Sequence, residues 1–144
     1  MSQHDVILLL GSNIGDRKKN IKTAIEKIEQ LAGRILNKSE ILETKPIEFA
    51  SFNIFINFAV LLKTYHSPYN LLKIIKKIER EMGREKDSRA IGRYEDRIID
   101  IDIVTYSNLT FVCKSLEIPH KKHLYEREFS KKLITQLYLE KHKL

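Results

Sequence analysis

GREKDSRAIGRYEDRIIDIDIVTY is the sequence from Gly83 to Tyr106, and it ends in a clear β-strand pattern. From Ile99 onward isoleucine alternates with aspartate, the period of two that is typical of a half-buried strand. Residues two apart in a strand share a face, with their Cα atoms roughly 6.5–7 Å apart. Asp100 and Asp102 are therefore expected on one face, with the isoleucines packed against the core on the other.

Basic residues precede this strand, and two interpretations of them are open. The residues are Arg84, Lys86, Arg89, Arg93 and Arg97. Carboxylates that hold Mg²⁺ beside several guanidinium groups are typical of phosphoryl transfer. Alternatively, the aspartates pair with the arginines in a salt-bridged loop that has no catalytic role. The spacing alone does not separate the two.

Length and charge limit the class of protein. The chain has 144 residues, of which 42% are hydrophobic, and a net charge of +7. These values predict one globular domain with an anionic partner such as a nucleotide, a nucleic acid or a phosphorylated metabolite. The positive charges are spread along the helical segments, so solvated helix faces account for most of them.

The cysteine content and hydropathy predict a cytoplasmic protein with no membrane partner. Cys113 is the only cysteine, which favours a reducing compartment and a buried structural thiol. No apolar run approaches the ~18 residues that a membrane span needs.

The rest of the chain predicts an α+β fold. Asp16 and the Ser67-Pro68 pair are typical helix starts, and Gly33 and Gly83 follow the two helices. The expected strands are 5–10, 34–43, 54–62, 98–106 and a short hairpin partner at 110–113; the last helix is expected at 127–142. This β-α-β-β-α-β order, with a hairpin strand and a C-terminal helix, indicates a ferredoxin-like antiparallel sheet in a three-layer α-β-α arrangement.

Two further features have a structural and a functional interpretation each. The Gly11-Ser12-Asn13 turn resembles a phosphate loop, but it lacks the Gly-x-x-x-x-Gly-Lys-Ser/Thr pattern, so a structural turn is expected. Phe55 and Asn57 share a strand face. They form either a platform for a flat heterocycle or a packing pair.

Five motifs together resemble the 6-hydroxymethyl-7,8-dihydropterin pyrophosphokinase family of folate synthesis, over residues 8–129. They are Gly11-Ser12-Asn13, Glu43-Thr44-Lys45-Pro46, Phe55-Ile56-Asn57, Gly83-Arg84 with 96–103, and Ile118-Pro119-His120 with Arg127-Glu128-Phe129. The resemblance implies transfer of pyrophosphate from ATP to the hydroxymethyl group of the pterin, releasing AMP.

The resemblance also implies roles for individual residues. Asp100 and Asp102 would hold two Mg²⁺ ions, and Arg84, Arg93 and Arg97 would complete the catalytic set. The pterin would contact Thr44, Ile47, Phe55, Asn57 and Phe129. ATP would contact Glu79, Arg84, Arg97, Ile103, His120 and Arg127. A monomer that binds these two small molecules and no nucleic acid is expected.

The sequence departs from the family pattern in two loops. The segment before Asp100 is about three residues longer, so Lys86, Arg89 and Arg93 compete for one phosphate-binding position; Arg93 is favoured because Tyr94 follows it. Residues 85–96 are expected to form a lid over ATP. The segment between His120 and Arg127 is one residue longer.

Two alternatives to an active pyrophosphokinase remain. The net charge and the aromatic residues on a sheet are also compatible with an RNA-binding domain. A relative of the family with weakened catalysis, acting as a scaffold, is the other.

Overall fold

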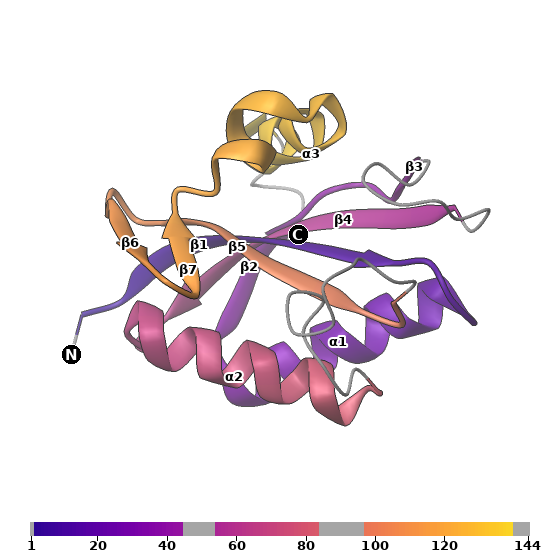
Figure 1. Ribbon diagram of the computed structural model, residues 1–144, viewed down its shortest axis with the longest axis horizontal. Helices are drawn as coiled ribbons and strands as arrows, with labels where there is room; N and C mark the ends of the chain where they lie inside the picture. The colour runs from indigo at the N-terminus through magenta and orange to yellow at the C-terminus, as the bar shows by residue number, and fades with distance from the viewer. Residues whose placement is uncertain (1, 45–53, 84–96, 140–144) are drawn as a thin grey trace.

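The protein has three layers, with one sheet between helices. The structure is a computed structural model that describes residues 2–44, 54–83 and 97–139. Helices α1 (Arg17–Leu31) and α2 (Pro68–Glu81) cover one face of the sheet, and α3 (Glu128–Leu139) lies over the other (Figure 1). None of the helices in this part of the chain has the length and hydropathy that a membrane span requires.

The central sheet is antiparallel throughout. Its strands are β1 (His4–Ser12), β2 (Arg34–Lys38), β3 (Leu42–Thr44), β4 (Phe55–Thr64) and β5 (Asp100–Tyr106). The order is β2-β4-β1-β5, and β3 pairs with the other end of β4. This order is the ferredoxin-like one, so the predicted fold class is confirmed.

The two long helices begin at the predicted capping residues. The Asp16 side chain accepts a hydrogen bond from the N–H of Lys19, and Ser67 accepts one from the N–H of Asn70. Each cap satisfies a backbone donor that has no partner within the helix. Gly83 follows α2 with φ +109°, a conformation that favours glycine.

The core is divided between the two faces of the sheet. The larger cluster lies between the sheet and helices α1 and α2, and it contains Ile99, Ile101 and Ile103. The smaller cluster lies under α3 and includes Leu9 and Val104. The isoleucines of β5 therefore face the larger core, and the aspartates face the α3 side, as the alternation predicts.

The strand predicted at 34–43 is interrupted. Ser39 separates β2 from β3, because its hydroxyl accepts the Ala59 N–H (2.9 Å) while its own N–H donates to the Ala59 carbonyl (2.9 Å). The Ser39 hydroxyl thus accepts the Ala59 N–H, which a backbone carbonyl would accept in a continuous strand pair.

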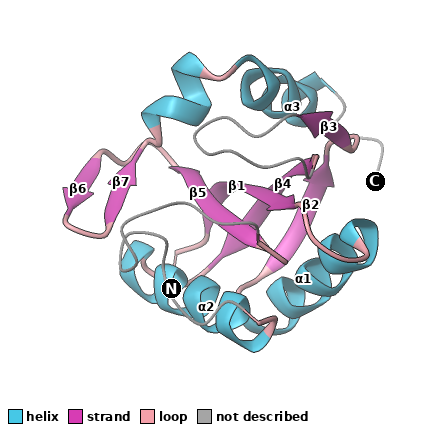
Figure 2. Cartoon of the chain, turned by 45° about the vertical axis from the view of Figure 1, so that its right-hand side comes forward, coloured by secondary structure: helices cyan, strands magenta, loops and turns pink. Residues whose placement is uncertain are grey.

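The short hairpin and the segment before the last helix also differ from prediction. Strand β6 (Phe111–Cys113) pairs with β7 (Leu116–Ile118) in a separate two-stranded sheet rather than with β5 (Figure 2). Its residues are exposed, so the prediction that Cys113 is buried is wrong. A π-helical turn, η1 (Lys122–Glu126), precedes α3 and was not predicted.

Gly33 provides a test of how closely α1 joins the sheet. A Cβ at this position would lie 2.1 Å from the Lys63 carbonyl oxygen, which is backbone and cannot move aside. We expect Gly33→Ala to lower the free energy of unfolding by about 3 kcal/mol in urea denaturation. Gly11→Ala is the control, since its Cβ would meet only ordinary contacts from 3.5 Å outward. Equal losses in both variants would contradict the close approach.

Candidate active site

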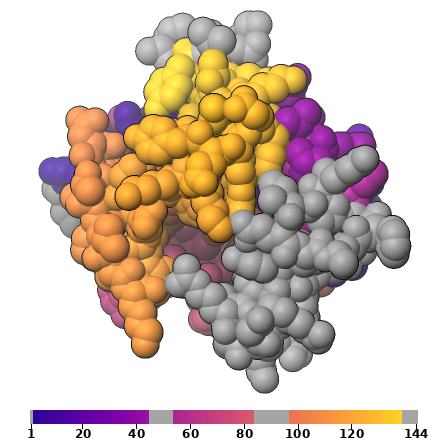
Figure 3. Space-filling view, turned by 45° about the horizontal axis from the view of Figure 1, so that its top comes forward, coloured from indigo at the N-terminus to yellow at the C-terminus, as the bar shows by residue number. Residues whose placement is uncertain are grey.

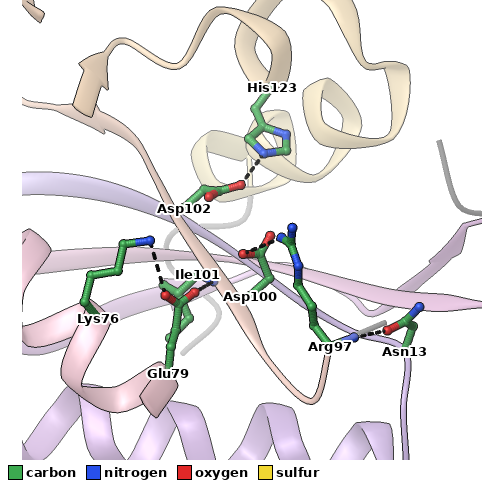
Figure 4. Close-up of polar contacts among 8 residues, drawn as sticks. All are labelled: Asn13, Lys76, Glu79, Arg97, Asp100, Ile101, Asp102 and His123. Atoms are coloured by element: carbon green, nitrogen blue, oxygen red, sulfur yellow. Dashed lines mark hydrogen bonds and ion pairs between the residues drawn. The ribbon is translucent and has the colours of Figure 1, made fainter. Parts of the chain in front are cut away.

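The two acids of β5 point to the same side of the sheet, each toward a basic group (Figure 4). Asp100 Oδ1 lies 3.0 Å from Arg97 Nη1, and Asp102 Oδ2 lies 2.7 Å from His123 Nε2. The contact with Arg97 is the one that the salt-bridge interpretation predicts. The aspartate side chains nevertheless retain 24% and 31% of their exposure, so a ligand can reach both carboxylates.

The surroundings of Asp102 keep it ionised. Burial favours the neutral acid and raises its pKa, but the hydrogen bond and charge of His123, with the charges of His120 and Arg97, outweigh burial and hold the pKa of Asp102 well below its usual range. A carboxylate of this kind can hold a cation without first losing a proton. Burial lowers the pKa of His120 and outweighs the charge of Asp102, which raises it. The net effect favours the neutral imidazole of His120.

Glu79 fixes the backbone of β5 between the two acids. Its Oε2 accepts the N–H of Ile101 at 2.8 Å, and its Oε1 lies 3.5 Å from Lys76 Nζ (Figure 4). Strand β5 is at the edge of the sheet, where an outward N–H has no strand partner. The buried carboxylate supplies that partner from α2. The predicted contact of Glu79 with ATP remains a prediction.

Asn13, which directly follows β1, holds Arg97 by its backbone. The Asn13 N–H donates to the Arg97 carbonyl at 3.0 Å, and Asn13 Oδ1 accepts the Arg97 N–H at 2.7 Å (Figure 4). Asn13 is only 2% exposed. Asn13 thus positions the arginine that contacts Asp100, whereas Gly11 and Ser12 belong to β1 and do not form the predicted turn.

Asn57 presents its amide on the same side of the sheet. Its Nδ2 donates to Thr44 Oγ1 at 2.6 Å and to the Leu42 carbonyl at 3.4 Å. These bonds fix the orientation of the amide and leave Oδ1 toward Gly11, where a Cβ would lie 3.5 Å from it. Such a Cβ would also lie 3.6 Å from the ring of Phe55.

Strand register places the Asn57 amide and one acid, Asp100, in one row. Gly11 pairs with Asn57 on β4 and with Asp100 on β5. Neighbouring strands are about 4.8 Å apart, so the backbones of Asn57 and Asp100 lie roughly 10 Å apart across β1. The residue between them has no side chain. The sheet therefore offers a bare strip with an amide at one end and an acid at the other.

The segment before α3 and the first turn of α3 bring three more predicted residues to this side. His120 donates its N–H to the Val104 carbonyl of β5 at 2.8 Å. The ring of Phe129 meets that of His123 edge-on, with 6.3 Å between centroids, and Arg127 is half-buried between η1 and α3. Figure 3 shows this segment, in gold, forming a continuous surface beside the orange β5–β7 segment.

Other predicted residues are not placed at the site. The Ile103 side chain is buried in the larger core, so the contact predicted with adenine would have to be made by its main chain. Ile47, Arg84 and Arg93 lie outside the described residues, as do Lys86, Arg89 and the predicted lid.

The sequence analysis missed His123 and its neighbour Ser130. His123 Nδ1 lies 2.8 Å from Ser130 Oγ, so the histidine connects the serine to Asp102. The His-x-x-His spacing from His120 was the available signal. This signal was weak, because the spacing indicates that two histidines share a helix face but not which strand that face packs against.

Fold and site together define an α+β domain in which an acid pair lies beside basic groups, an arrangement that is typical of phosphoryl-transfer enzymes. Residues 7–138 match the family model described as 7,8-dihydro-6-hydroxymethylpterin-pyrophosphokinase (HPPK). The chain belongs to this family.

Relatives and solved structures agree with the family match. A 2-amino-4-hydroxy-6-hydroxymethyldihydropteridine pyrophosphokinase of Porphyromonas gingivalis is 41% identical over 125 residues, which are 86% of this chain and 84% of the relative. The enzyme of that name from Bacillus subtilis is 35% identical over 85% of this chain and 71% of its own length. The crystal structure of Plasmodium falciparum HPPK-DHPS wild type superposes with a TM-score of 0.66 at 18% identity, over 86% of this chain and 39% of that one.

Two hydrogen bonds join Asn13 to the backbone of Arg97, and we call this pair the Asn13 clamp. Loss of the Asn13 side-chain amide tests it. Asn13→Ala leaves a part-buried N–H without its acceptor, so we expect the free energy of unfolding to fall by about 1–2 kcal/mol and the Arg97 amide to exchange hydrogen faster. Asn70→Ala, at an exposed position, should change stability by no more than about 0.5 kcal/mol. An unchanged exchange rate at Arg97 would contradict the clamp.

Proposed function

We propose that this chain transfers pyrophosphate from ATP to the hydroxymethyl group of 6-hydroxymethyl-7,8-dihydropterin, giving the pterin diphosphate and AMP in folate biosynthesis. Membership of the family and 41% identity to a pyrophosphokinase over most of the chain support this reaction. The chain is an ATP-dependent pyrophosphokinase, as the sequence resemblance implied.

The observation that carries the proposal is the row Asn57–Gly11–Asp100. A pterin has alternating donors and acceptors along one edge, and a fixed amide can match them. With that edge on Asn57 the flat ring lies across Gly11, and its far end points to the acids of β5. The reacting hydroxyl is thereby brought to the part of the sheet where Asp100 and Asp102 lie.

The donor set of β5 fits magnesium. Two partly exposed carboxylates on one strand face supply the hard oxygen ligands that Mg²⁺ prefers. When bound by Asp100 and Asp102, Mg²⁺ would neutralise triphosphate charge and orient the phosphorus that is attacked.

The side chains have separate tasks in this reaction. The pterin hydroxyl attacks the β-phosphorus, the bond to the α,β-bridging oxygen breaks, and AMP leaves. Arg97, held by Asn13, stabilises phosphate charge, and His120 and Arg127 contact the nucleotide. Asp102, oriented by His123, would steer the hydroxyl proton by accepting its hydrogen bond. Most of the catalysis is positioning and charge stabilisation.

The remaining assignments complete the proposal. Thr44, Ile47, Phe55 and Phe129 would enclose the pterin, and Arg84 and Arg93 would contact phosphates. Residues 1–144 would form one pterin pyrophosphokinase domain that acts as a cytoplasmic monomer and binds no nucleic acid. Use of two Mg²⁺ ions belongs to the same proposal.

Product analysis tests the reaction. With ATP, Mg²⁺ and the hydroxymethyl pterin, we expect AMP and pterin diphosphate in equal amounts, and no ADP. Asp102→Asn should remain folded and lose roughly 100-fold or more in turnover. Asp5→Asn, which removes only a surface ion pair with Lys63, should keep full turnover. ADP as the product, or no turnover that depends on the pterin, would refute the reaction, and an active Asp102→Asn would refute the role of the acid.

Gly11→Ala tests where the pterin lies. One methyl group on the bare strip occupies space that the ring needs, so we expect the KM for the pterin to rise about tenfold or more. The KM for ATP should stay within about twofold, since the nucleotide lies beyond Asp100. Steady-state kinetics with each substrate varied measures both values. An unchanged KM for the pterin would show that the ring does not cross β1 at this position.

A further inference from the structure

Asp102 and two histidines beside it form a cluster with the ligand types of a metal site. Asp102, His120 and His123 each place a ligand atom so that all three lie within 4.8 Å of one another. The closest pair is Asp102 Oδ2 and His123 Nε2, at 2.7 Å, and the imidazole rings lie 4.2 Å apart between centroids with a tilt of 34°. The carboxylate comes from β5, and the histidines come from the segment that leads into α3.

The far side of His123 is held as metal-binding histidines usually are. Its Nδ1 lies 2.8 Å from Ser130 Oγ, and Ser130 is completely buried. A ligating histidine typically donates its other ring N–H to a protein oxygen, which fixes the ring and aims the free nitrogen at the ion. With only 3% of its surface exposed, His123 has little freedom to turn elsewhere.

The π-helical turn places His123 in the cluster. The segment between His120 and Arg127 forms η1, and a π-helical turn holds one residue more than an α-helical turn. Turns of this kind occur frequently at functional sites. Here η1 exposes Lys122 and Tyr125 and turns His123 inward, onto the carboxylate of Asp102.

The donor set selects the kind of ion. Two imidazole nitrogens with one carboxylate oxygen suit zinc, cobalt, nickel and related ions, whereas magnesium and calcium prefer oxygen ligands alone. We propose that Asp102, His120 and His123 form a binding site for a divalent transition-metal ion of the zinc class, with a ligand set distinct from the Asp100–Asp102 pair.

Binding requires His123 to present Nε2 without a proton, and it requires small movements of the ligands. In the metal-bound form His123 carries its proton on Nδ1 and donates it to Ser130. Ligand atoms around such an ion are roughly 3–3.5 Å apart, so the pair at 2.7 Å must open slightly and the widest pair, within 4.8 Å, must close by up to about 1.3–1.8 Å. The charge of Arg97 opposes the cation only weakly, because Asp100 lies 3.0 Å from its guanidinium.

The site shares Asp102 with the proposed reaction, and in that respect it rests on the proposed function. An ion held by the histidines draws the carboxylate toward η1 and away from Asp100. Transition-metal binding and pyrophosphoryl transfer are therefore expected to oppose each other.

Cobalt titration of the full-length, metal-free protein without nucleotide tests the site. We expect one Co²⁺ to bind with the intensified visible absorption of nitrogen-containing, low-coordinate sites, and Zn²⁺ to abolish that spectrum while a large excess of Mg²⁺ does not. His123→Gln and His120→Gln should each weaken Co²⁺ binding at least about tenfold. His66→Gln, which changes a histidine outside the cluster, should bind Co²⁺ as the unaltered protein does.

Two further variants separate this site from the reaction. Asp100→Asn should abolish pyrophosphoryl transfer and leave the cobalt spectrum intact, because Asp100 is outside the cluster. Ser130→Ala keeps all three ligands and should weaken Co²⁺ binding, with its fold checked by circular dichroism. Cobalt binding that survives His123→Gln unchanged, or that Mg²⁺ displaces as easily as Zn²⁺, would overturn the proposal whether or not AMP is formed.

Discussion

Two carboxylates on one face of a single strand repel each other, and much of this structure serves to hold them there. Arg97 and His123 each provide a basic group for one acid, at 3.0 and 2.7 Å. Glu79 holds the backbone between the acids from the opposite side. The result is an edge strand that cannot shift its register without breaking contacts from α2 and η1 together. Such rigidity suits a site whose catalysis depends on positioning.

The ferredoxin-like order of strands places Asn57 of β4 near Asp100 of β5, on the same face of the sheet. Because β1 lies between β4 and β5, residues far apart in sequence become neighbours across it, and Gly11 separates Asn57 from Asp100. The smaller core under α3 includes Leu9, the next outward residue of β1, so the helix begins to cover the sheet just beyond this row. The register of β1 against β4 and β5 therefore sets the positions of both Asn57 and Asp100.

Patterns local in sequence predicted the local structure well. The isoleucine alternation of β5 gave the correct face for Asp100 and Asp102, and the caps at Asp16 and Ser67 gave correct helix starts. Contacts between distant segments were not accessible in this way. The clamp of Asn13 on Arg97 joins residues 84 positions apart, and a π-helical turn breaks the 3.6-residue period that would have shown which way His123 faces.

The claim on which the rest depends is that pterin and acids meet across Gly11. A crystal structure with Mg²⁺, an α,β-methylene analogue of ATP and the hydroxymethyl pterin tests it directly. We expect the pterin ring over β1, with its polar edge on Asn57, its hydroxymethyl group toward β5 and the β-phosphate beside Asp100 and Asp102. A pterin bound away from this row, or phosphates that leave both aspartates without contact, would contradict it.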